Sequence, residues 1–181
     1  MYIYQMWFIL QRIQKSFSLS ERLIRVIRRS TPQMTPFTLL GDGRFISDTI
    51  ENLIAEGVDV NCSSGDLLPL HCACHVGDIL CVKILLRNGA KANLRDGYNR
   101  TALHYAAEKC ASCVGLLLNY DADVNKQDGD GRSPLHYAAW KNKSLCALRL
   151  LEAGADPNAS DSRLDTPLCY AASKGKFNDA I

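Results

Sequence analysis

The sequence has no strong excess of charge of either sign. Its 21 basic and 19 acidic side chains give a net charge of +2. The first 30 residues hold six basic groups and one acidic group, which leaves 15 basic and 18 acidic groups for the rest of the chain. A slightly acidic body lacks the basic surface that nucleic-acid binding requires. We therefore expect no nucleic-acid partner.

The sequence also lacks an apolar run that could cross a membrane. The apolar start, residues 1–10, is far shorter than the roughly 20 residues that a membrane-spanning helix needs. It has no basic segment before it and no small-residue cleavage site after it, as a secretory signal would have. We interpret this segment as a packing helix and expect a cytoplasmic protein with no membrane partner.

Regularly spaced asparagines are the main feature that the sequence does contain. Asn61, Asn93, Asn125 and Asn158 lie 32, 32 and 33 residues apart. Each is followed by a polar stretch and then by a helix start of one type: Leu68-Pro69-Leu70-His71, Thr101-Ala102-Leu103-His104, Ser133-Pro134-Leu135-His136 and Thr166-Pro167-Leu168-Cys169. A period of about 33 residues with this start is typical of ankyrin repeats, which bury their apolar faces by stacking. The pattern predicts an all-α ankyrin-repeat solenoid of helix-turn-helix pairs with short β-hairpin loops.

The repeat pattern also divides the chain. We expect an N-terminal helical extension or cap at 1–29, a linker at 30–43, a divergent first repeat at 44–62, and three full repeats and an incomplete one over 63–181. Asp121 stands where the other repeats have a glycine, so a small strain is expected there. Because the last repeat stops within its second helix, we expect a fragment, a truncated isoform or an early-ending gene model. The helix pairs are predicted near 69–76 and 79–87, 102–109 and 112–119, and 134–141 and 144–152.

The N-terminal extension has two interpretations. Ser18-Leu19-Ser20-Glu21 has the pattern of a capping box, and a helix from there has an apolar stripe opposite several arginines. The helix could lie on a membrane surface or bind a partner. We favour a cap that covers the first repeat. The stripe consists of Leu19, Leu23, Val26 and Ile27, and the arginines are Arg22, Arg25 and Arg29.

The eight cysteines and four histidines include metal-ligand types, but the repeat register explains most of them. Cys81, Cys113 and Cys146 hold one position in three successive second helices, where a free thiol packs as a small apolar group. Each histidine of a helix start is expected to hydrogen-bond the backbone of a hairpin. A structural zinc site usually needs two ligand pairs, and the sequence has one C-x-x-C pair, Cys110 and Cys113. We expect no metal, no cofactor, no disulfide framework, no catalytic residues and no enzymatic activity.

Ankyrin repeats bind protein targets in a concave groove formed by the hairpin tips and the exposed side of the first helices. Tryptophan, tyrosine and arginine are frequent interface hot spots, and Trp140 is the strongest candidate. The repeating Tyr105, Tyr137 and Tyr170 are expected to be half-buried packing residues instead. The predicted partner-binding residues are Tyr98, Arg100, Lys109, Asp130, Arg132, Trp140, Lys141 and Arg163.

Several runs resemble the ankyrin repeat and SOCS box proteins. They are Met6-Trp7-Phe8-Ile9, the capping-box segment, Pro69-Leu70-His71-Cys72-Ala73-Cys74 and residues 96–109. The resemblance implies a substrate receptor for ubiquitination, in which a C-terminal SOCS box binds elongin B/C and a cullin. We find no such box here, because Leu70-x-x-x-Cys74, which is superficially similar to its start, lies in the first helix of a repeat. The chain is therefore expected to be either the substrate-binding part of such a receptor or a freestanding module that regulates a partner by occupancy.

Overall fold

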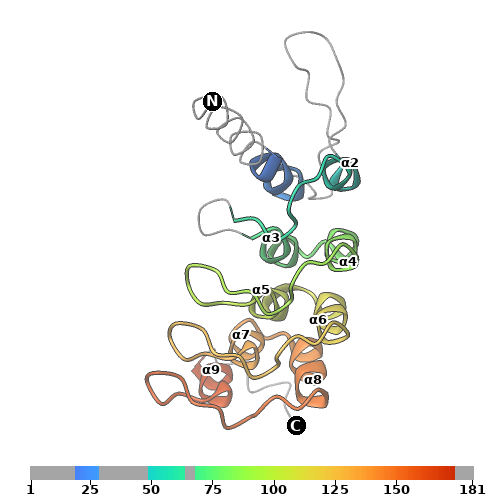
Figure 1. Ribbon diagram of the computed structural model, residues 1–181. Coiled ribbons are helices and arrows are strands. Elements are labelled where there is room, and N and C mark those ends of the chain that lie inside the picture. Colours follow the sequence, from blue (N-terminus) through green and yellow to red (C-terminus); the bar gives the residue numbers. More distant parts are fainter. Residues whose placement is uncertain (1–18, 29–48, 64–67, 174–181) are drawn as a thin grey trace, which may run out of the picture.

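Two stacked columns of helices form the molecule (Figure 1). The computed structural model describes residues 19–28, 49–63 and 68–173, and these residues include no strand. The predicted all-α ankyrin solenoid is confirmed, and the predicted helix boundaries differ from the observed ones by at most one residue. The first helices stack in one column and the second helices in the other. The first column holds α3 (Pro69–Val76), α5 (Ala102–Lys109), α7 (Pro134–Trp140) and α9 (Pro167–Ser173), and the second holds α2 (Ile50–Ala55), α4 (Ile79–Arg87), α6 (Ala111–Leu118) and α8 (Ser144–Glu152).

The core repeats the same positions from one unit to the next. In the second column, Leu85, Leu117 and Leu150 are each 0% exposed. Removing such a side chain from water is worth about 1.5–3 kcal/mol. Since helices of seven to nine residues are too short to be stable alone, this shared core stabilises them. The cysteines Cys81, Cys113 and Cys146 belong to it as predicted, with exposures of 6%, 0% and 2%.

The periodic asparagines link consecutive repeats. The Asn93 amide nitrogen donates to the Asp121 carbonyl at 2.8 Å, and its amide oxygen accepts the N–H of Asp123 at 2.8 Å. Asn61 bonds in the same way to Gly89 and Lys91, and Asn125 to Gly154 and Asp156. An asparagine satisfies a backbone donor and a backbone acceptor of the next repeat together, which gives a physical reason for its 32- or 33-residue period.

Two irregular turns distinguish the unit built on α5 and α6. Asp121 has a φ of +56°, in the left-handed region, where the equivalent residues Gly57, Gly89 and Gly154 lie at +87°, +86° and +88°. The prediction that an aspartate adopts glycine geometry there is confirmed. The turn between α5 and α6 consists of Cys110 alone, which accounts for the shorter 32-residue step between His104 and His136.

Residues 19–28 form a helix next to α2 (Figure 1). Leu23 and Ile27 are fully buried, and Arg22 forms an ion pair with Glu56 of 3.3 Å. Ile24 is buried at 5% exposure, whereas Val26 of the predicted stripe is only half-buried. The other expectations for residues 1–18, for the linker at 30–43 and for residues 174–181 lie outside the described residues. Among the described residues, no helix is long and apolar enough to cross a membrane.

Candidate partner-binding surface

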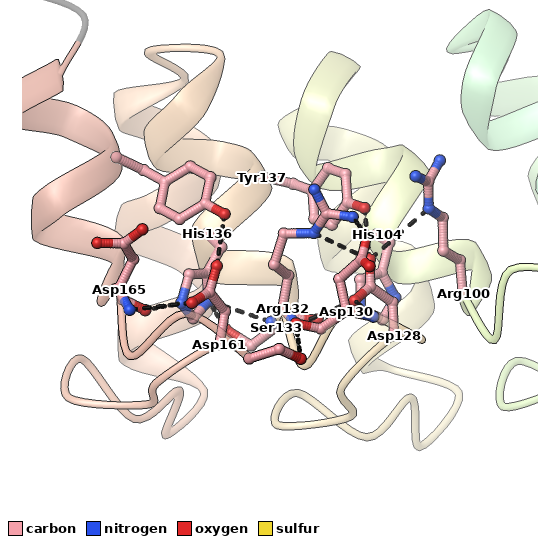
Figure 2. A network of polar contacts seen from close by, with 12 residues as sticks. Arg100, His104, Asp128, Asp130, Arg132, Ser133, His136, Tyr137, Asp161 and Asp165 are labelled. Carbon is pink, nitrogen blue, oxygen red and sulfur yellow. Dashed lines mark hydrogen bonds and ion pairs between the residues drawn. The ribbon is translucent and has the colours of Figure 1, made fainter.

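Each hairpin is organised around one buried or half-buried aspartate. Asp128 is 7% exposed, and its Oδ1 accepts the backbone N–H groups of Asp130 and Arg132, each at 2.9 Å. Its Oδ2 accepts the hydroxyl of Tyr137 at 2.6 Å, as Figure 2 shows. One carboxylate therefore fixes both the turn of the loop and the first helix after it. The same arrangement joins Asp96 to Tyr98, Arg100 and Tyr105, and Asp161 to Arg163, Asp165 and Tyr170.

The histidines attach each hairpin to the preceding repeat. His104 Nδ1 accepts the N–H of Thr101 at 3.0 Å, so the proton of the neutral ring lies on Nε2, which donates to the Arg132 carbonyl at 3.1 Å. His136 makes the equivalent bonds to Ser133 and to the Asp165 carbonyl. Burial lowers the pKa of His104 to about 4, so this ring is neutral at pH 7. The prediction that these histidines hold hairpin backbone is confirmed.

Arg100 and Arg132 converge on Asp128 and Tyr137 from two successive hairpins (Figure 2). Their Nε atoms lie 3.8 and 3.3 Å from Asp128 Oδ2, and their guanidinium carbons lie 5.2 and 5.5 Å from the centre of the Tyr137 ring. The side chains are only 26% and 20% exposed. Both arginines therefore serve the internal network as well as the surface, which the hairpin position alone did not reveal.

Trp140 and Lys141 extend this network to the end of α7. The Trp140 ring is 37% exposed and meets the Tyr137 ring edge to face, with 6.4 Å between centroids. Lys141 Nζ lies 4.2 Å from the centre of the Trp140 ring and 3.9 Å from the Glu108 carboxylate on α5. A tryptophan with one covered edge and a cation over its ring is a preorganised contact for a partner, because it loses little freedom on binding.

Six of the eight predicted binding residues thus belong to one continuous chain of contacts. Tyr137 and Asp128 connect them, Asp130 joins through its ion pair with Arg132, and Tyr98 joins through the Arg100 guanidinium at 5.2 Å from its ring. Lys109 is exposed at the last position of α5, and Arg163 contacts its own hairpin and Tyr170. The connected six are Tyr98, Arg100, Asp130, Arg132, Trp140 and Lys141.

Sequence reasoning missed the organising aspartates. Their signal was present, since Asp96, Asp128 and Asp161 each precede a repeating tyrosine by nine residues. It also treated the three tyrosines alike, as half-buried residues. Tyr105 and Tyr170 are half-buried, but Tyr137 is 2% exposed, because both arginines and Trp140 surround it.

All eight cysteines are free thiols. In the part of the chain that the structure describes, no three histidine, cysteine or acidic side chains gather in a way that could hold a metal ion.

Comparison with known proteins agrees with this architecture. Two ankyrin-repeat family models match, "Ankyrin repeats (3 copies)" over residues 43–128 and "Ankyrin repeats (many copies)" over residues 116–171. "Ankyrin repeat and SOCS box protein 8" from Homo sapiens is 53% identical over 78 residues, and the same protein from Mus musculus is 52% identical. These matches cover 42% of this chain and only about a fifth (22%) of either relative.

A third match separates repeat from function. The "ADP-ribosylation factor GTPase-activating protein AGD4" of Arabidopsis thaliana is 50% identical over 36 residues, which is about one repeat, and the match covers 20% of this chain and 5% of that protein. Such a short likeness concerns the scaffold alone. The chain belongs to the ankyrin-repeat family, and the resemblance to the ankyrin repeat and SOCS box proteins that the sequence predicted is confirmed.

Proposed function

We propose that this chain holds a protein target on the face formed by its hairpins and by the exposed ends of α5 and α7. The observation that carries the proposal is the Tyr137–Trp140–Lys141 group, in which a buried tyrosine supports a partly exposed tryptophan. Tryptophan at the centre of a contact surface is the residue type most enriched in interface hot spots. No catalytic step is proposed for it.

The exposed side chains around Trp140 indicate what the target offers. Tyr98 is 63% exposed, and Lys109, Lys141 and Arg163 extend cations from three successive repeats. A partner segment with apolar side chains for Trp140 and Tyr98, and with acidic side chains for the flanking cations, complements this surface. The acidic groups contribute mainly to association rate and specificity, because exposed ion pairs add little affinity.

We further propose that the target is held for ubiquitination, as the resemblance to the ankyrin repeat and SOCS box proteins implies. In this proposal elongin B/C and a cullin bind only a form that carries a SOCS box, and the protein acts in the cytoplasm. The alternative is regulation of the target by occupancy alone. Co-purification of the 181-residue chain with elongin B/C separates the two regions: we expect no binding, and stable binding would contradict our assignment of the recruiting element to another segment.

The binding surface can be tested with a matched pair of aromatic variants. Trp140→Ala removes the proposed anchor, and Tyr120→Ala removes an aromatic side chain of similar exposure, 42% against 37%, from the segment after α6. Proteins that cross-link to the tagged wild-type chain in cells are quantified for each variant. We expect Trp140→Ala to reduce capture of a target about tenfold or more, with Tyr120→Ala close to wild type.

The stability of both variants is measured alongside. Trp140→Ala is expected to lower the free energy of unfolding by no more than ~1 kcal/mol, because its ring is partly exposed. Equal capture by all three chains would refute the assignment of Trp140, as would a loss of capture that follows unfolding of the variant.

A further inference from the structure

Two cysteines meet at the start of α6. Cys110 is the whole turn between α5 and α6 and is the N-cap of α6, with an extended backbone at φ −144° and ψ 107°. Its Sγ accepts the backbone N–H of Cys113 at 3.4 Å, and the two thiols hydrogen-bond each other. Cys110 is partly exposed, whereas Cys113 is 0% exposed. An accessible sulfur and a buried sulfur are therefore in contact at one helix terminus.

The preceding repeat shows which kind of group this position accommodates. Asp78 is the N-cap of α4, and its carboxylate accepts the N–H groups of Leu80 and Cys81 at 3.0 and 3.1 Å and the thiol of Cys81 at 2.9 Å. Cys110 places a sulfur where α4 has this carboxylate. Helix N-termini favour negative charge, and the thiolate is the reactive form of cysteine.

We propose that Cys110 and Cys113 form a reversible dithiol–disulfide site that a hydroperoxide oxidises. In the first step the Cys110 sulfur attacks the peroxide O–O bond and becomes a sulfenic acid, which releases one water. In the second step the Cys113 sulfur displaces the hydroxyl from that sulfenic acid, which forms the S–S bond and releases a second water. The two thiols together lose two electrons and two protons, and the peroxide gains them. A small-molecule dithiol reverses the reaction by exchange.

The order of the two steps follows from burial. Burial, together with the hydrogen bond to Cys110, raises the pKa of Cys113 and keeps it a protonated thiol inside the core. Peroxide therefore reaches Cys110 first, and Cys113 acts as the resolving partner. The equivalent cysteines of α4 and α8 cannot form such a pair, because Cys81 and Cys146 follow Asp78 and Lys143 at the position where Cys113 follows Cys110. This site does not depend on the proposed binding function.

Mass spectrometry tests the site directly. Trypsin cleaves after Lys109 and Lys126, so Cys110 and Cys113 share one peptide with no other cysteine, and cleavage after Lys143 and Arg149 isolates Cys146. The reduced full chain is treated with hydrogen peroxide, then unfolded in urea and alkylated before digestion. We expect the 110–126 peptide to lose both alkyl groups and to be lighter than the reduced peptide by two hydrogen atoms. Dithiothreitol treatment before alkylation is expected to restore both labels.

Variants distinguish this linkage from other oxidation. Cys110→Asp copies the N-cap of α4, and in this variant Cys113 is expected to keep its label at a peroxide dose that oxidises the wild-type pair. Cys146→Ser is expected to leave formation of the 110–113 disulfide unchanged. The inference is overturned if the exposed Cys169 loses its label while Cys110 and Cys113 remain alkylated, if Cys110 links to Cys74 or Cys146 instead, or if Cys113 is oxidised equally in the Cys110→Asp variant.

Discussion

Replacing Asp128 with alanine removes the group on which two arginines, one tyrosine and two backbone amides converge. The carboxylate is 7% exposed, so water cannot easily replace its lost hydrogen bonds. The variant leaves the Tyr137 hydroxyl and two N–H groups without their acceptor and leaves Arg100 and Arg132 without their counter-charge. Breaking a buried charged network in this way costs about 3–5 kcal/mol. We expect a decrease of that size in the free energy of unfolding.

Asp96→Ala provides the matched comparison. Asp96 makes the same three hydrogen bonds, to the N–H groups of Tyr98 and Arg100 and to the Tyr105 hydroxyl, but it is half-buried. Water can solvate part of what this variant exposes, so we expect a smaller cost of about 1–3 kcal/mol.

Urea denaturation followed by circular dichroism measures both variants, with Glu152→Gln as an exposed control. Tyr137→Phe in the Asp128→Ala background should cost less than it does alone, because the two groups share one bond. The reasoning is refuted if Asp128→Ala costs no more than Asp96→Ala, or if the Asp128 and Tyr137 effects simply add.

Two further predictions concern pH and backbone strain. Because burial lowers the pKa of His104 from 6.5 to about 4, the unfolded chain binds a proton in this range that the folded chain excludes. The free energy of unfolding should therefore fall by up to ~3 kcal/mol as the pH drops through this window. Urea titrations across the window should show a weaker pH dependence for His104→Gln, and an unchanged slope would contradict the assignment. Asp121→Gly should raise the thermal midpoint by relieving a positive φ, by up to ~1 kcal/mol; a lower midpoint would mean that the Asp121 side chain contributes more than the strain costs.

The helices could be predicted from the sequence because each repeat confirms the others. Pro69, Pro134 and Pro167 mark first helical positions, and Gly89 and Gly154 mark the left-handed residues after the second helices. The shortened turn was also visible as a 32-residue step. Such local signals recur with the period of the array, so few alternatives remain.

The network at Asp128 could not be predicted in the same way. Its aspartate, tyrosine and Arg132 belong to one repeat and have a fixed spacing, but Arg100 comes from the hairpin before it. Whether an arginine at a loop points to solvent or toward the next repeat depends on the offset between stacked hairpins, which no single repeat encodes. For the same reason the sequence listed Arg100 as a surface residue, although three-quarters of its side chain is covered.

The side-chain bonds between repeats all run in one direction along the chain. The asparagine amides and histidine rings of a repeat bond to backbone groups that lie 28 to 31 residues later in the sequence. During synthesis at about 5–20 residues per second, each of these groups meets its partner within a few seconds of leaving the ribosome. The array can therefore assemble co-translationally from its N-terminal side, and an added repeat lengthens the protein without lengthening any loop that folding must close.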